Sequence, residues 1–306
     1  MSSLAAEQSG TFVSIPLEGI SGDEPLEFPL YLQNRAGRPV LYRDVRTPFD
    51  ASHAARLRAE GVTHLWVHEH DKRGYARRVE AGLEDLLHDR SVPAEERAEV
   101  LHGVALVVAQ DVLGKPPGRD EVRRVERFLV STATLVVREP GAFHAIRQLL
   151  RAGQDLADHS TTVAFLSLGL ARQVVGAEPN TLVQASLAGF LHDVGLVGRP
   201  LTEDDTDTQH AERGYRFLRE QGLPEPVCEA AWAHHERHDG SGLPRGLVGE
   251  SIPLLGRIVG LVDAFEKVYS GQKTRMGVFD ALRVLAQAYR GCFDEDLAVS
   301  LLRVFR

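Results

Sequence analysis

The sequence is poor in cysteine, has no excess of basic residues and lacks any long apolar run. Its two cysteines, Cys228 and Cys292, stand far apart and in no CxxC spacing, which argues against a disulfide framework and against a thiolate metal site. The net charge of −8 argues against binding to a nucleic-acid polymer or to an anionic membrane, because both need a basic surface. No apolar stretch reaches about 18 residues, and the N-terminus lacks the features of a secretory signal. We therefore expect a cytoplasmic protein without a membrane partner.

The remaining composition is that of an ordinary globular protein. With 306 residues, 43% hydrophobic and 25% charged, the chain is long enough for about two domains. Residues 1–75 carry short runs rich in β-branched and aromatic residues, such as TFVSIPL and THLWVHE, and one helical stretch with Asp50 or Ser52 as its cap and Gly61 as its stop. Residues 76–306 follow a helical pattern nearly to the end. We predict an α+β protein, with a small N-terminal α/β domain that is regulatory or partner-binding and an all-α domain after it.

Histidine and aspartate gather in the helical half of the chain. Asp155 and His159 stand four residues apart in DLADHS, so a helix would present both on one face. His192 and Asp193 follow the apolar helical segment TLVQASLAGFL, so this pair is expected at a buried helix end. Asp263 lies within IPLLGRIVGLVDAFEKVYS, where a lone carboxylate is costly unless it is paired or binds a cation. A metal ion would explain these placements together.

Each element has an ordinary alternative when it is taken alone. A single histidine on a helix is more often a hydrogen-bonded core or surface residue than a ligand, and Asp263 could instead pair with Arg257 or Lys267. The segment HERHD does not complete HExxH, because Asp239 occupies the position of the second histidine, and this excludes a zincin. What favours a metal site is the conjunction: an HD pair, the isolated His210, an HH pair and a later buried aspartate, in this order.

This order of residues resembles the HD superfamily of metal-dependent phosphohydrolases, and within it the HD-GYP branch. The resemblance spans about residues 150–306, and its specific part is HHERHDGSGLPRGLVGESIPLLGRIVGLVDAF, which is similar to the branch's HHE-x-x-DGSGYP loop and RI-x-x-x-x-D helix. It implies an all-α domain that holds two iron or manganese ions, or three, and hydrolyses the bacterial messenger cyclic di-GMP. Carried over by position, the implied metal ligands are His159, His192, Asp193, His210, His234, His235 and Asp263, with Asp155 as a further candidate where members with a third ion usually have Glu.

The residue types suit this chemistry by themselves. Imidazole and carboxylate ligands without thiolate suit iron, manganese or zinc. A carboxylate such as Asp193 can bridge two ions about 3.5–4 Å apart, and a hydroxide held between them would be the nucleophile. Glycines in the GSG turn permit a close backbone approach to a guanine or phosphate. The candidate substrate contacts are Gly240, Gly242, Leu243 and Pro244, with Arg237 and Lys273, and also Arg245, as cations near the loop in sequence.

Two positions depart from the pattern of the branch and leave two functions open. The HD motif continues as HDVGL, with Leu196 where a phosphate-contacting lysine is expected, and the GYP triad reads GLP, with Leu243 in place of tyrosine. We predict a metal-dependent phosphodiesterase that hydrolyses cyclic di-GMP or a related cyclic dinucleotide. The alternative is a catalytically weak or inactive metal-containing receptor that binds a cyclic dinucleotide and signals to a protein partner, in which case the N-terminal domain is the candidate surface for that partner.

Overall fold

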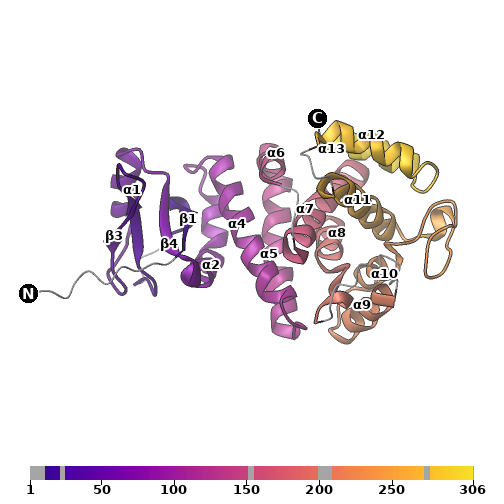
Figure 1. The fold of residues 1–306 in the computed structure, drawn as a ribbon, viewed down its shortest axis with the longest axis horizontal. Helices are drawn as coiled ribbons and strands as arrows, with labels where there is room; N and C mark the ends of the chain where they lie inside the picture. Colours follow the sequence, from indigo (N-terminus) through magenta and orange to yellow (C-terminus); the bar gives the residue numbers. More distant parts are fainter. Residues whose placement is uncertain (1–10, 21–24, 151–154, 199–208, 272–275, 306) are drawn as a thin grey trace, which may run out of the picture. The chain divides into compact units, whose positions relative to one another are not determined.

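The computed structural model describes residues 11–20, 25–150, 155–198, 209–271 and 276–305 (Figure 1). The chain divides into two compact units, Met1–Val107 and Val108–Arg306. The first unit holds an antiparallel sheet with helices, and the described part of the second is helical. The predicted α+β architecture, with strands first and helices after them, is therefore confirmed.

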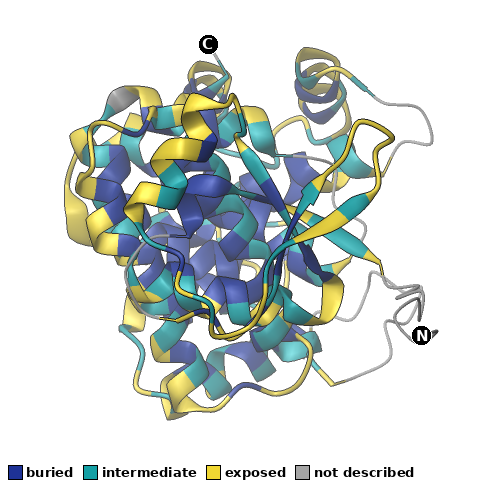
Figure 2. Cartoon of the chain, turned by 90° about the vertical axis from the view of Figure 1, so that its left-hand side faces the viewer, coloured by how far each residue is buried: buried dark blue, intermediate teal, exposed yellow. Residues whose placement is uncertain are grey.

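The sheet of the first unit has four antiparallel strands in the order β1-β4-β2-β3. The strands are β1 (Phe12–Pro16), β2 (Leu30–Gln33), β3 (Pro39–Arg43) and β4 (His64–His68). Helix α1 (Ala51–Ala59) lies between β3 and β4 in the sequence, and the Asp50 carboxylate caps it by accepting the backbone N–H groups of Ser52 and His53. Gly61 follows the helix with a φ of +80°, a conformation that glycine adopts without strain. Figure 2 shows buried residues, in dark blue, on the strands as well as on the helices.

The first unit extends past residue 75, where the change of sequence pattern placed the boundary. It includes α2 (Lys72–Ala81), α3 (Leu83–His88) and the first part of α4 (Ala94–Leu113). The Tyr75 ring packs so closely on the turn after β1 that a Cβ at Gly19 would lie 2.1 Å from its hydroxyl oxygen. His64 of β4 bonds Glu99 of α4 at 3.0 Å. Contacts of α2 with the turn after β1 and of α4 with β4 thus accompany the assignment of these helices to the unit of the sheet. Independent folding of the two predicted domains stays a prediction.

The second unit is built around three helices that are largely buried. After the end of α4, the described part of the unit holds the α-helices α5 (Arg119–Arg138), α6 (Pro140–Leu149), α7 (Leu156–Val175), α8 (Pro179–Leu191), α9 (Gln209–Glu220), α10 (Glu225–Ala233), α11 (Leu254–Ser270), α12 (Val278–Ala288) and α13 (Glu295–Val304). Helices α7, α8 and α11 contact one another and bury most of their residues, as helices that are apolar on most sides must. Polar residues on these helices are thereby carried into the core.

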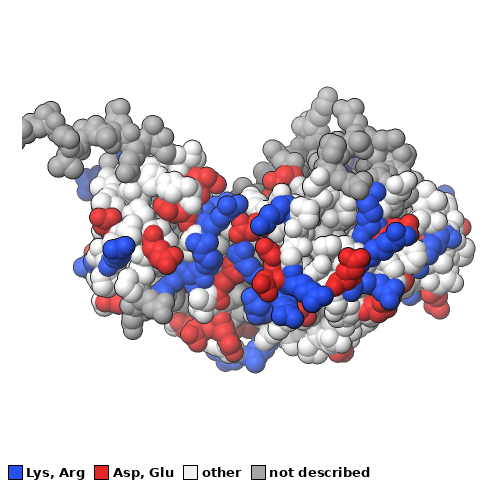
Figure 3. Space-filling model, turned by 90° about the horizontal axis from the view of Figure 1, so that it is seen from below, with Lys and Arg blue, Asp and Glu red and all other residues white. Residues whose placement is uncertain are grey.

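Two further properties concern membrane-spanning helices and the distribution of surface charge. None of the helices in the described ranges combines the length and the apolar character needed to span a bilayer. On the face shown in Figure 3, lysine and arginine side chains are interspersed with aspartate and glutamate.

Candidate metal centre

The ends and inner faces of five helices in the second unit bring the seven predicted ligands together. The HD and HH pairs each follow directly after the last turn of a buried helix, α8 or α10. Close helix crossings make this convergence possible: a Cβ at Gly189 of α8 would lie 2.8 Å from the carbonyl oxygen of Val163 on α7, and one at Gly260 of α11 would lie 2.4 Å from that of His234. The convergent residues are His159 on α7, His192 and Asp193 after α8, His210 on α9, His234 and His235 after α10, and Asp263 on α11.

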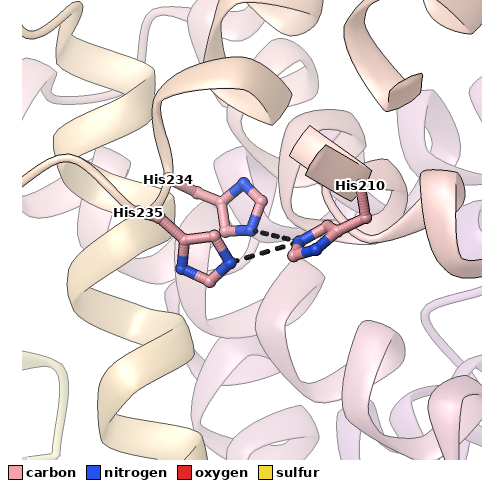
Figure 4. A group of neighbouring side chains, drawn as sticks. All are labelled: His210, His234 and His235. Atoms are coloured by element: carbon pink, nitrogen blue, oxygen red, sulfur yellow. Dashed lines mark hydrogen bonds between the residues drawn. The ribbon is translucent and has the colours of Figure 1, made fainter. Parts of the chain in front are cut away.

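Three imidazoles form the first group, shown in Figure 4. The Nε2 atom of His210 lies 3.2 Å from the Nε2 atoms of both His234 and His235. His234 Nδ1 lies 2.8 Å from the Ala231 carbonyl oxygen, and because a carbonyl only accepts, this nitrogen carries the proton. In the neutral His234 ring, Nε2 therefore turns a lone pair to its neighbours. The three Nε2 atoms converge on one point, where a metal ion would bind a lone pair from each ring.

His159, His192 and Asp193 form the second group. The Nε2 atoms of the two rings are 3.2 Å apart. His192 Nδ1 donates to the carbonyl oxygen of Gly189 at 2.8 Å, so in the neutral ring its Nε2 also faces the centre with a lone pair. Asp263 Oδ1 completes this side, 3.2 Å from His159 Nε2 and 3.6 Å from His192 Nε2.

Asp193 lies between the two groups. Its Oδ1 atom is 3.0 Å from His210 Nε2 and 3.4 Å from His234 Nε2. Its Oδ2 atom is 3.3 Å from His192 Nε2 and 3.7 Å from His159 Nε2. One carboxylate therefore turns one oxygen to each group of imidazoles.

The carboxylates provide the test of whether this cluster fits a metal. Oδ1 of Asp193 and Oδ1 of Asp263 are buried, and neither accepts a hydrogen bond of good geometry from the part of the chain that is described. A buried carboxylate oxygen left in this way is costly unless a cation is bound. Within each group, moreover, the candidate ligand atoms all lie within 4.8 Å of one another. The donor set fits a metal site of imidazole and carboxylate ligands.

Residues 151–297 match the HD domain family. The chain carries an HD domain. A cyclic di-GMP phosphodiesterase of Pseudomonas aeruginosa is 31% identical to it over 176 residues, which are 53% of this chain and 42% of that protein. The 3'3'-cGAMP-specific phosphodiesterase 3 of Vibrio cholerae is 27% identical over 221 residues, which are 67% of this chain and 46% of that protein. The chain thus spans less than half the length of these curated relatives.

A solved structure shows the same fold over nearly the whole chain. Bd1817, described as a HDG"Y"P protein from Bdellovibrio bacteriovorus, matches with a TM-score of 0.68 and 18% sequence identity, and the match covers 96% of this chain and 99% of that one. The predicted resemblance to the HD superfamily is confirmed by the match of residues 151–297 to the HD domain family.

Sequence reasoning missed Glu266, which orients a ring of the HD domain. Its Oε2 atom lies 2.5 Å from His159 Nδ1, on the side of the ring opposite to the cluster, and Ser270 donates to its other oxygen. Carboxylates that bond the outer nitrogen of a metal-binding imidazole fix its orientation and raise its basicity. Glu266 stands three residues after Asp263 on α11, so helical spacing was a usable signal for it.

Asp155 lies outside the cluster. It is exposed, and it caps the start of α7 by accepting the Asp158 backbone N–H at 2.8 Å. Because α7 begins at Leu156, Asp155 and His159 do not share a helix face as the spacing suggested. The residue that contacts His159 from outside the cluster is Glu266.

The cations predicted near the loop have other contacts. Arg237 Nη1 donates to the carbonyl oxygens of His234 and Glu236, and its guanidinium packs over the Phe293 ring. Arg245 is equally engaged, because it binds Glu229 at 3.0 Å and packs 4.2 Å over the Trp232 ring. Lys273 lies outside the described residues.

The ion-pair alternatives for Asp263 are also settled by the structure. Arg257 instead binds Asp294 at 2.9 Å, whereas Lys267 Nζ lies 3.1 Å from Asp263 Oδ2. Asp263 therefore presents one oxygen to the imidazoles and the other to an ammonium group.

The GSGLP loop folds back onto the HH pair. Leu243 donates its backbone N–H to the His235 carbonyl oxygen at 3.2 Å. A Cβ at Gly242 would lie 2.2 Å from the backbone nitrogen of Arg237, so only glycine fits there. Gly240 has a φ of +82°, and the Leu243–Pro244 peptide is cis. Leu243 is 53% exposed.

The far end of the same loop is held by Glu236, a second residue that sequence reasoning missed. The Glu236 carboxylate accepts the backbone N–H of Arg245 at 2.8 Å and that of Leu247 at 2.9 Å. Leu196, in the short helix Val194–Leu196 after the HD pair, is half-buried. The HD domain thus places an ordered loop next to the HH pair, with an exposed leucine at its tip.

The two histidines of the second group, His159 and His192, have raised pKa values when no metal is bound. Burial lowers the pKa of His159, but hydrogen bonds with Asp263 and Glu266 outweigh it and raise the pKa to about 10. Burial also opposes protonation of His192, and the charge of Asp193 outweighs it and raises the pKa to about 9. Both rings therefore hold protons at neutral pH in the metal-free HD domain.

The adjacent histidines of the HH pair behave in the opposite way. Burial, as the largest cause, lowers the pKa of His234 to about 4 and that of His235 to about 2. Both rings are therefore neutral at neutral pH and need to lose no proton before they bind a metal.

Metal binding should accordingly release protons from the second group. Ligation needs lone pairs on Nε2 of His159 and His192, whose pKa values of about 10 and about 9 lie above neutral pH. We expect release of about two protons per chain, and an affinity for Mn²⁺ that rises with pH toward these pKa values. Calorimetric titration with Mn²⁺ in buffers of different ionisation enthalpy measures the release. Binding without proton release would contradict the assignment.

Proposed function

We propose that the chain is a metal-dependent phosphodiesterase that hydrolyses cyclic di-GMP or a related cyclic dinucleotide. The observation that supports this most strongly is Asp193, whose two oxygens face two separate groups of imidazole nitrogens. A pair of ions joined by one carboxylate is a recurrent arrangement for cleaving phosphate esters. The activities in the names of the relatives support a cyclic dinucleotide as substrate.

Each group would hold one ion. His159, His192 and Asp263 would bind the first, and His210, His234 and His235 the second, with Asp193 giving one oxygen to each. Such ligands suit iron or manganese. Bound divalent ions supply Lewis acidity toward a phosphodiester oxygen and a water-derived nucleophile near neutral pH. Because Asp155 serves as a helix cap, we propose two ions instead of three.

The chain's own residues orient and enclose this site. The carbonyl groups of Gly189 and Ala231 hold two rings by their Nδ1 protons, and Glu266 holds His159 in the same way. The loop that follows the HH pair borders the cluster, so its residues are the candidate substrate contacts. They are Gly240, Gly242, Leu243 and Pro244.

A receptor without efficient turnover is the second candidate. Leu196 offers no charge after the HD pair, and the guanidinium groups of Arg237 and Arg245 are held by other residues. A cyclic dinucleotide could then be bound by the metal ions and released unchanged, and the N-terminal domain would contact a signalling partner.

Metal loading and turnover decide between the two candidates. We expect about two transition-metal ions per chain after anaerobic purification, and cleavage of cyclic di-GMP to the linear dinucleotide. Chelation should abolish cleavage, and Fe²⁺ or Mn²⁺ should restore it. The measurement combines elemental analysis with chromatography of a panel of cyclic dinucleotides. Fully loaded protein that binds but cleaves none of them supports the receptor, and protein with less than one ion per chain contradicts both candidates.

A further inference from the structure

Strand β3 forms an edge of the sheet in the first unit and exposes apolar side chains there. It is the last strand in the order β1-β4-β2-β3, and among the described strands only β2 pairs with it. Val40 and Leu41 of this strand are 50% and 52% exposed, and Val45 just after it is 41% exposed. An edge strand also presents a row of backbone N–H and C=O groups to which another chain can pair.

Arginines flank these apolar residues on both sides in the sequence. Residues 34–47 hold four arginines and one acidic residue, Asp44, so this stretch has a net charge of +3 in a chain whose net charge is −8. The four are exposed or half-buried, and none of them forms an ion pair with another described residue. Asp44 instead accepts the backbone N–H of Val45 at 2.7 Å. We call the apolar residues and the four arginines the β3 surface: Val40, Leu41, Val45, Arg35, Arg38, Arg43 and Arg46.

The backbone at Arg46 is strained. Its φ is +66°, and no other non-glycine residue in the described ranges has a positive φ. Glycine adopts this conformation far more readily than a residue with a side chain. The Arg46 N–H donates to the Leu26 carbonyl oxygen at 2.9 Å, which helps to hold the backbone in place. Strain of this kind is concentrated at functional sites, so an arginine at this position indicates a use for its guanidinium group.

The β3 surface suits an acidic peptide better than a second copy of the chain. Pro39 has no N–H group, and the register between β2 and β3 skips Tyr42, and both features hinder long edge-to-edge pairing. Two copies paired along β3 would also bring their arginines together. Carboxylates neutralise arginines through strong hydrogen bonds, and an extended peptide presents alternate side chains that can cover Val40 and Leu41.

We propose that the β3 surface is a docking site for an extended acidic segment of a partner protein, with apolar residues between its carboxylates. This inference goes beyond the proposed function, because it needs neither a metal ion nor turnover. It assigns a chemical character to the partner that the N-terminal domain is expected to contact.

The test uses the full chain and a labelled peptide of alternating glutamate and valine with blocked ends. Fluorescence anisotropy gives the Kd of wild type, of Arg38→Gln/Arg46→Gln and of the matched control Arg77→Gln/Arg90→Gln, which removes two exposed arginines outside the β3 surface. An exposed ion pair is worth up to about fivefold in affinity, so the first variant should raise Kd about five- to thirtyfold and the control should not change it. Leu41→Gln should also raise Kd, and added salt should weaken wild-type binding.

Arg46→Gly separates binding from stability. Glycine relieves the strained backbone, so this variant should unfold at a higher temperature than Arg46→Gln in a thermal scan. Its affinity for the peptide should nevertheless be as weak as that of Arg46→Gln, because both lack the guanidinium group. Full affinity in Arg46→Gly would show that Arg46 does not contact the peptide.

Several outcomes would overturn the inference. They are a wild-type protein that does not bind the peptide, an unchanged Kd in Arg38→Gln/Arg46→Gln, and equal affinity for a peptide of alternating glutamate and serine. Tighter binding of an oligo(dT) strand or of phosphatidylglycerol vesicles would assign the arginines to a nucleic acid or a membrane instead. A dimer in sedimentation experiments that Leu41→Gln dissociates would assign the surface to a second copy. These measurements need no bound metal, so failure of the proposed phosphodiesterase activity would leave them unaffected.

Discussion

Replacement of Asp193 by alanine should leave the protein with less than one metal ion per chain. The reason is the position of the carboxylate, which has one oxygen within 3.4 Å of two imidazole nitrogens and the other within 3.7 Å of two more. In the proposed two-ion site, the substitution would take one anionic ligand from each ion at once. Loss of a residue that only orients a ligand costs about 10–100-fold in metal affinity or activity, so the loss of a shared ligand should exceed that range.

Elemental analysis of anaerobically prepared protein measures this effect, together with the rate of cyclic di-GMP cleavage. Asp280→Ala is a suitable control, because Asp280 is exposed on α12 and pairs with Arg283 at 2.9 Å, away from the candidate ligands. Asp193→Asn, which keeps the shape but removes the charge, should lose less metal than the alanine variant. A fully loaded Asp193→Ala protein would show that the carboxylate joins no ions.

Burial of the HD pair, the HH pair and Asp263 was predictable from their local contexts, whereas His210 was assigned from the order of motifs in the resemblance. His192 and His234 each follow an apolar helix, and such a helix end is buried wherever the helix packs in the core. Asp263 is surrounded by apolar residues in the sequence, and burial of its carboxylate demands a partner. These signals are local, so a single sequence reveals them.

Side-chain direction could not be predicted in the same way. Arg245 looked like a substrate contact because it follows the glycine-rich turn, yet it packs over Trp232, which precedes it by 13 residues. Asp155 looked like a ligand because of its spacing from His159, yet the helix begins one residue later and uses Asp155 as its cap. Which partner a long or terminal side chain selects depends on tertiary contacts that a spacing rule does not contain.

The boundary near residue 75 shows a similar limit. The sequence pattern does change from strands to helices there, because α2 begins at Lys72. The compact unit nevertheless continues to Val107. Tyr75 packs on Gly19 after β1, and Glu99 of α4 bonds His64 of β4. A change of periodicity therefore marks a change of element type, and packing decides where a unit ends.

Glu236→Ala should destabilise the second unit and loosen the loop beside the metal centre. The Glu236 side chain is 0% exposed. One of its oxygens accepts the backbone N–H of Arg245 and the other that of Leu247, both at the far end of the loop. Each partner left without an acceptor costs about 1–3 kcal/mol, so we expect a loss of about 3 kcal/mol in the free energy of unfolding. For a unit of this size that corresponds to a Tm lower by roughly 6–12 °C.

The functional effect of Glu236→Ala should follow from where the loop is attached. Leu243 bonds the carbonyl oxygen of His235, so a loop that loses its return contacts also loses its fixed position next to the HH pair. We expect a higher KM for the cyclic dinucleotide, with the metal of the His159 and His192 side retained. Glu236→Gln should be intermediate, because its amide oxygen can replace one of the two acceptors while its NH2 group faces the other donor. Glu250→Ala, at an exposed position of the same segment, is the control and should melt like the wild type. If calorimetry finds Glu236→Ala within about 2 °C of the control, the carboxylate does not hold the loop, and its burial must have another cause.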